Sequence, residues 1–148
     1  MSANALLTTT DLRHNTRMPN RAIEFHDSTL DSVRADGTNL TIRFSAAYIH
    51  ESNGEPGLDA GAGWTQEALI HIEDASVAGK IHELPCSLSD GRLRLGGDLL
   101  EMIPIPLDYE GNIEINLEQF GEMRITGTHV HLELVGKATY VEQFPGSR

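Results

Sequence analysis

Apolar and polar residues alternate over many short segments of this chain, and turn signals separate the segments every ~8–12 residues. The longest clean alternation covers residues 40–50, whose even-numbered residues from Leu40 to Tyr48 are apolar and are expected to share one face. No segment carries the i, i+3, i+4, i+7 repeat of an amphipathic helix for three turns, and residues 95–102 would form one helical turn at most. The pattern predicts an all-β fold: an antiparallel sandwich, jelly roll or barrel of about 8–10 strands, with little or no helix.

The character of the sequence changes once, near residue 20. Residues 1–20 are polar and have no sustained period, so we predict a flexible N-terminal arm, or an arm that orders on a partner. Residues 21–148 are numerous enough to form one domain with a substantial core. Because aromatic residues make up only 5% of the chain, Leu, Ile and Val must supply most of that core. We therefore predict a single all-β domain over residues 21–148.

Prolines and glycines indicate where the predicted sheet is interrupted. Pro104 and Pro106 have no N–H to donate to a neighbouring strand, so residues 99–107 are expected at a sheet edge. Residues 51–63 contain four glycines and a proline and are predicted to be the main loop. Apolar residues are odd-numbered before Gly127 and even-numbered after it, which predicts a β-bulge at this glycine.

The charge of the chain excludes several classes of partner. The formal net charge is −11, and residues 51–148 carry all of this excess, with six basic and seventeen acidic side chains. Without a basic stripe the chain is poorly suited to nucleic acid or to anionic membrane surfaces. No apolar run approaches the ~20 residues of a membrane span. An acidic surface would instead suit a basic protein partner.

Cysteine content and the N-terminal residues bear on the cellular compartment. Cys86 is the only cysteine, so the chain cannot form an internal disulfide. The N-terminus has neither the basic start nor the apolar stretch of ~7–15 residues that a signal peptide has. We therefore expect a cytoplasmic, bacterial-type location.

The strongest chemical lead is the segment His129-Val-His131-Leu-Glu133, whose polar side chains share one face of a strand. Two imidazoles at this spacing lie ~6.6–7 Å apart and can bind one zinc or iron ion together. His129 and Glu133 are ~13 Å apart along a straight strand, so a complete site needs a ligand from another strand. His71 and Glu73 are the candidates, and the predicted metal ligands are His129, His131, His71 and Glu73.

Other interpretations of these residues stay open. The favoured one is a solvent-facing polar row, since antiparallel sheets often have one face in water. A buried polar role or an interface is the third. The His-x-His spacing is similar to that of cupins, but the glutamate and glycines of that family are misplaced here, so no cupin ligand is assigned.

Two potential nucleophiles lack the arrangement that catalysis needs. His26-Asp27-Ser28 contains the three residue types of a hydrolase triad, but Asp27 would point away from the other two on a strand. A turn hydrogen bond from Asp27 or Ser28 that ends the strand is the favoured interpretation. Cys86 lacks a nucleophile signature and is interpreted as a small buried thiol. No catalytic residue is predicted.

The segment from Ile23 to Leu30, with the closing Tyr140-Val-Glu, resembles small uncharacterised bacterial β-proteins, some of them immunity-like. The resemblance implies an all-β fold and transfers no catalytic residue. The predicted function is a non-enzymatic β module of a bacterial cytoplasm that binds a small molecule or a protein. A homodimer and a basic partner are the predicted assemblies. The alternative is a zinc- or iron-binding β-barrel, with or without enzymatic activity; otherwise no cofactor is predicted.

Overall fold

The structure, a computed structural model, describes residues 18–146, which form ten β-strands and no helix. The all-β prediction of about 8–10 strands is confirmed. The strands are β1 Asn20–Asp36, β2 Asn39–Ser52, β3 Gly61–Glu73, β4 Ser76–Gly79, β5 Cys86–Ser87, β6 Asp90–Leu95, β7 Asp98–Leu100, β8 Met102–Ile105, β9 Asp108–Glu118 and β10 Glu122–Phe144. The predicted N-terminal arm lies outside the described residues as far as residue 17, and the division into an arm and one domain stays a prediction.

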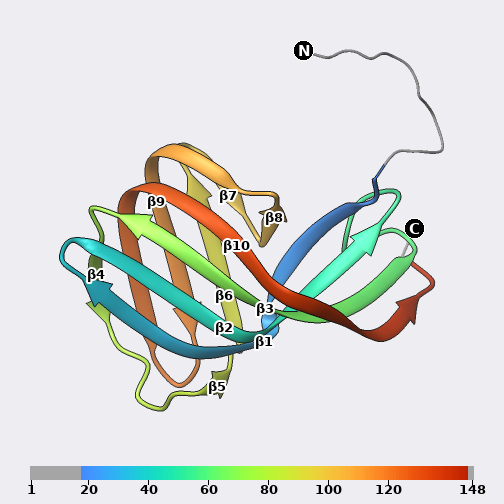
Figure 1. The fold of residues 1–148 in the computed structure, drawn as a ribbon, viewed down its shortest axis with the longest axis horizontal. Coiled ribbons are helices and arrows are strands. Elements are labelled where there is room, and N and C mark those ends of the chain that lie inside the picture. The colour runs from blue at the N-terminus through green and yellow to red at the C-terminus, as the bar shows by residue number, and fades with distance from the viewer. Residues whose placement is uncertain (1–17, 147–148) are drawn as a thin grey trace.

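All ten strands belong to one antiparallel sheet, whose order is β5-β1-β2-β3-β10-β9-β6-β7. In addition, β4 pairs with β10 and β8 pairs with β1. The sheet curls, so that β6 contacts both β1 and β8 across the core. Figure 1 shows that the long strands β1, β2, β3 and β10 continue beyond the curled part of the sheet. We call this projecting part the strand extension; it comprises residues 20–24, 48–52, 61–65 and 139–144.

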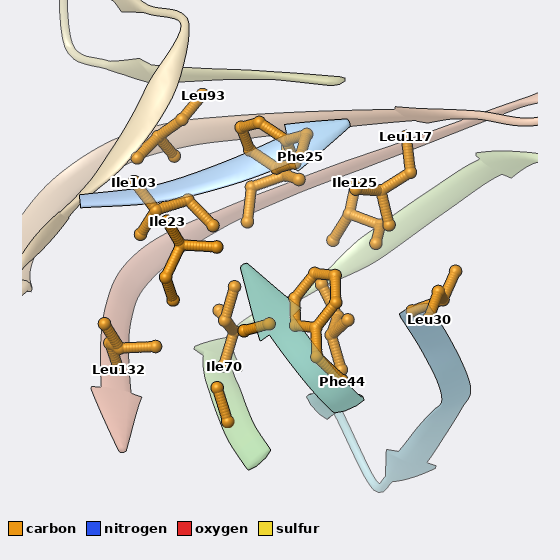
Figure 2. Packing of buried hydrophobic residues seen from close by; sticks show 14 of the residues in the cluster. Ile23, Phe25, Leu30, Phe44, Ile70, Leu93, Ile103, Leu117, Ile125 and Leu132 are labelled. Atoms are coloured by element: carbon orange, nitrogen blue, oxygen red, sulfur yellow. The ribbon is translucent and has the colours of Figure 1, made fainter. Parts of the chain in front are cut away.

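The core lies inside the curl and consists almost entirely of aliphatic side chains with a few phenylalanines. Figure 2 shows these side chains converging from β1, β2, β3, β6, β8, β9 and β10. Along β10, the buried residues are Met123 and Ile125 before Gly127, and Val130 and Leu132 after it. The pairing of β10 with β9 shifts register between Gly127 and His129. The predicted bulge at Gly127 is therefore confirmed.

A second bulge overturns part of the prediction for β2. Its even-numbered residues face the core as expected from Leu40 to Phe44. The register with β3 then shifts between Phe44 and Ala47, and Ala47 rather than Ala46 is fully buried. The extra residue of a bulge reverses which parity faces the core, so the expectation was wrong beyond Phe44.

Two segments are more regular than their composition predicted. The loop between β2 and β3 covers only residues 53–60, because Ser52 pairs with Gly61 and the strands continue on both sides. Residues 95–102 contain the end of β6, all of β7 and the start of β8, and they form no helical turn.

The expected edge position of the segment with Pro104 and Pro106 is confirmed, since β8 is bonded to β1 alone among the described strands. Within residues 18–146, no helix is long and apolar enough to cross a membrane.

Candidate functional site

The structure places the four predicted metal-ligand residues directly across from one another. His129 on β10 is opposite Glu73 on β3, and His131 is opposite His71. Their neighbours on both strands, such as Val130 and the isoleucines of β3, are buried in the core. The four polar side chains therefore lie together on the outer face of the sheet.

His129 lies between two carboxylates. Its Nδ1 is 2.9 Å from Oε2 of Glu73, and its Nε2 is 2.6 Å from Oδ1 of Asp108 on β9. The other oxygen of Asp108 is 3.6 Å from Nδ1 of His131. The sequence did not indicate Asp108, because the register of β9 with β10, shifted between Gly127 and His129, places it opposite His131.

His71 is bonded on both sides within the same face. Its Nε2 is 2.9 Å from Oε1 of Glu133, and its Nδ1 is 3.3 Å from the hydroxyl of Thr41 on β2. Its ring stacks on that of His131, with centroids 6.2 Å apart. Each nitrogen of His71 therefore has a partner within the outer face of the sheet.

The carboxylates favour the protonated form of His129. The hydrogen bond with Asp108, followed by that with Glu73, raises the pKa of His129. The hydrogen bond with His129 in turn lowers the pKa of Asp108. An imidazolium with a carboxylate on each side is a charge-assisted hydrogen-bond network. A metal would need the imidazole deprotonated.

No three His, Cys, Asp or Glu side chains among residues 18–146 are arranged to hold a metal ion. The predicted ligands are adjacent, but their histidines form separate hydrogen bonds with carboxylates: His129 with Glu73 and Asp108, and His71 with Glu133. Their donor atoms do not converge on one point where an ion could bind. The assignment of His129, His131, His71 and Glu73 to zinc or iron stays a prediction.

We expect the stabilisation from His129 to depend on pH. A histidine whose folded pKa is raised stabilises the protein fully below its unfolded pKa of about 6.5 and loses this contribution as the pH rises through the folded pKa. The urea midpoint of His129→Gln should therefore fall further below that of the wild type at pH 6 than at pH 9. The exposed His82 provides a matched His→Gln control. An equal difference at both pH values would contradict the raised pKa.

A second cluster lies in the strand extension and is more buried. His50 on β2 is 9% exposed, and its Nε2 is 2.8 Å from Oε1 of Glu24 on β1. Its Nδ1 is buried and has no hydrogen-bond partner among residues 18–146. The ring stacks on Phe144 of β10 at a centroid distance of 5.0 Å. The ring of His50 is therefore held by the hydrogen bond of Nε2 with Glu24 and by stacking on Phe144.

Tyr48 reinforces the same cluster. Its ring centroid is 5.2 Å from that of His50, and its hydroxyl donates a hydrogen bond to Glu142 on β10. Burial, followed by this hydrogen bond, raises the pKa of Tyr48. The phenol stays protonated at neutral pH and serves to tie β2 to β10.

A pocket of about 260 Å³ opens beside His50. Leu58 and Asp59 from the 53–60 loop and Phe144 from β10 form much of its wall, and residues 145–146 complete it. Several of these contributors are apolar, and the ring of His50 is the buried polar group among them. The pocket therefore combines a largely apolar wall with two polar side chains, His50 and Asp59.

A second pocket, of about 320 Å³, lies on the other side of the same loop and shares Gly57 and Leu58 with the first. Glu24, which binds His50, also lines it. Its other acidic residues are Glu55, Asp90 and Glu101. The surroundings of the His50 pocket are thus strongly acidic.

The sequence held no signal for the burial of His50. The bulge between Phe44 and Ala47 removes His50 from the face that begins at Leu40, and the residues of β2 do not reveal this bulge. Glu24 has no local signal either, since the pairing of β1 with β2 brings the two side chains together.

We expected Asp27 or Ser28 to end the strand, and this was wrong: the His26-Asp27-Ser28 segment forms a bulge inside β1, which continues to Asp36. Asp27 has a φ of 73°, and the register with β2 shifts between Glu24 and Thr29. Ser28 is fully buried; its hydroxyl donates to the carbonyl of Glu24 and accepts from the N–H of Tyr48. This serine is a structural link between strands.

Comparisons of the chain with protein-family models, with curated proteins and with solved structures found no match.

Proposed function

We propose that this protein is a non-enzymatic binding module that takes a small molecule into the His50 pocket. The observation that supports this proposal is the largely apolar cavity of about 260 Å³ whose wall includes Leu58, Pro145 and the stacked rings of His50 and Phe144. Apolar pockets with a few polar groups are the usual small-molecule sites.

The hydroxyls linked to this cluster support binding rather than catalysis. A nucleophile needs a base within hydrogen-bond reach and access to its substrate. The hydroxyl of Ser28 is fully buried and engaged with backbone on both sides. The hydroxyl of Tyr48 is engaged with Glu142. His50 itself is held by Glu24, and neither of these two hydroxyls, in the part of the chain that the structure describes, is bonded to it as a nucleophile would be.

A nuclear magnetic resonance screen with a panel of one- and two-ring fragments tests this function. Binding fragments are expected to shift the ring resonances of His50, and Leu58→Trp, which fills the pocket from the loop, should abolish the shifts. Leu99 is half exposed and does not line the pocket, so Leu99→Trp is a matched control that should leave the shifts unchanged. If no fragment shifts His50, or if Leu58→Trp binds as the wild type does, the proposal fails.

The second candidate function is metal binding by the row on the outer face. The hydrogen bond between Glu73 and Nδ1 of His129 favours this function. In metal sites, a carboxylate bonded to one imidazole nitrogen often orients the ring so that the other nitrogen binds the metal. His129 and His131 would bind the ion with Asp108, which would have to exchange its hydrogen bond for a metal bond. Elemental analysis after incubation with zinc or iron checks this; a His131→Ala variant with unchanged metal content would contradict it.

The predicted homodimer, the basic protein partner and the cytoplasmic location stay predictions. Light scattering of the purified chain checks the first. The acidic pocket beside the loop supports the second, because its carboxylates suit a basic side chain.

A further inference from the structure

We propose that the end of β10, residues 137–146, is a flap that separates from β3 about Gly136 and opens the His50 pocket while the rest of the sheet stays folded. We call these residues the flap. The role of the flap at the pocket rests on the function proposed above, whereas its opening is measured without a ligand. Three features of the molecule support it: the missing neighbour along β10, the conformation of Gly136, and the wall that the flap gives to the pocket.

The backbone of the flap is held to the sheet along one edge only. β9 pairs with β10 as far as His131, so beyond Leu132 the backbone of β10 is paired with β3 alone among the described strands. Every residue from 136 to 143 is exposed, and Figure 1 shows this end of β10 at one margin of the strand extension. Segments with few buried contacts and exposed backbone hydrogen bonds open at a lower free energy than the core. The flap can therefore leave β3 without disrupting the curled part of the sheet.

Gly136 has the properties of a hinge. Its φ of 73° lies in the left-handed region that favours glycine, and a Cβ atom there would meet no heavy atom of a non-adjacent residue within 4 Å. The register with β3 shifts between Val135 and Thr139, and it shifts again between Tyr140 and Glu142. The extra residues of such bulges are left unpaired, so fewer ladder hydrogen bonds hold the flap than its length would allow. Hinge residues absorb a large change in φ and ψ, and the open surroundings of Gly136 permit that change.

The flap forms one wall of the His50 pocket. Phe144, Pro145 and Gly146 line the pocket, and the ring of Phe144 stacks on that of His50. The remaining lining residues are His50 on β2 and residues 57–59 of the loop between β2 and β3. Opening would therefore remove the β10 wall and uncover one face of His50, while the opposite wall stays in place.

A side-chain hydrogen bond latches the flap. The hydroxyl of Tyr48 on β2 donates to Glu142 on β10, so this bond crosses β3. A Cβ atom at Gly63 on β3 would collide with the Tyr48 hydroxyl and lie 3.1 Å from the ring of Phe144, so the glycine makes room for the crossing. Hydrogen bonds to carboxylates are stronger than those between neutral groups. Tyr48 is therefore the residue whose loss should free the flap.

Amide hydrogen exchange of the full chain tests the flap. Flap amides that donate to β3 should have protection factors at least about 100-fold lower than those of residues 129–132, which are bonded on both sides. Tyr48→Phe removes the latch and keeps the ring, so it should lower the protection of the flap about tenfold further and leave residues 129–132 unchanged. Tyr109→Phe on β9 is the matched control and should leave the flap unchanged. Equal protection in the two segments, or an equal loss in both from Tyr48→Phe, would overturn the flap.

A cross-link tests whether the flap controls entry to the pocket. Thr65 on β3 and Thr139 on β10 are directly opposite each other, so Thr65→Cys with Thr139→Cys places two thiols across the ladder beyond Gly136. The background is Cys86→Ala, which leaves no third thiol. Oxidation should slow the association of a fragment that binds the pocket by about tenfold or more, and reduction should restore the rate. An unchanged rate would overturn the flap as the entrance.

The outcomes separate the flap from the function on which its role rests. If the exchange shows the flap opening but no fragment binds, the proposed function fails and the local opening stands. If fragments bind but the flap is as protected as residues 129–132, the pocket stands and the flap is overturned.

Discussion

Phe44→Ala is expected to lower the free energy of unfolding by about 3–5 kcal/mol, the largest effect we predict for a single substitution. Phe44 is fully buried, and Figure 2 shows its ring among aliphatic side chains from neighbouring strands. Removing the ring loses its transfer free energy and leaves a cavity that the sheet, held by hydrogen bonds on both sides of β2, cannot close. Small domains are stable by only about 5–15 kcal/mol, so a large part of the total is lost.

Urea unfolding followed by circular dichroism measures this effect. Phe120 provides the matched control, because its side chain is 91% exposed in the turn between β9 and β10. Phe120→Ala should change the free energy of unfolding by less than about 0.5 kcal/mol. Similar losses in both variants would show that Phe44 does not lie in the core.

Gly127→Ala is expected to cost about 1–3 kcal/mol, although it adds a single methyl group. A Cβ atom at Gly127 would lie 2.4 Å from Cγ2 of Ile72 and 2.8 Å from the backbone oxygen of Glu73. The second contact involves backbone, so β3 itself would have to move away from β10. This movement would separate Glu73 from His129 and so disturb the outer polar row.

Two measurements check the role of Gly127. Gly97→Ala is the matched control: Gly97 lies in a turn, and a Cβ atom there would have no heavy atom within 4 Å. Its stability should be unchanged or slightly higher, since alanine restricts the unfolded chain. The titration of His129 should also shift toward that of an ordinary histidine in Gly127→Ala only. A stable Gly127→Ala with an unchanged His129 titration would contradict the close approach of the strands.

Bulges explain where the strand pattern was informative and where it was not. The two-residue period of Leu40 to Phe44 predicted the buried face of β2, because alternation is a local property of an extended backbone. Beyond Phe44 the extra residue of a bulge reversed the faces, and the residues of β2 gave no sign of it. At Gly127 the same reversal was predictable, because apolar residues change parity on either side of a glycine.

The candidate sites divide in the same way. The sequence placed His129 and His131 on one face, and it proposed His71 and Glu73 as their neighbours, which the pairing of β3 with β10 places opposite them. The sequence pattern did not indicate Asp108, and it did not distinguish His50 from the other histidines. The roles of Asp108 and His50 depend on contacts between strands: Asp108 on β9 contacts His129 on β10, and Glu24 on β1 contacts His50 on β2.

By itself, the sequence determined the all-β fold, the edge position of the two prolines, the bulge at Gly127 and the acidity of the chain, because each depends on local backbone geometry or composition. Only the tertiary structure decided which histidine is buried with an unused nitrogen and which is held between carboxylates. The physical reason is that strand order and register bring together residues distant in the chain. Burial and protonation depend on those neighbours rather than on the residue's own segment.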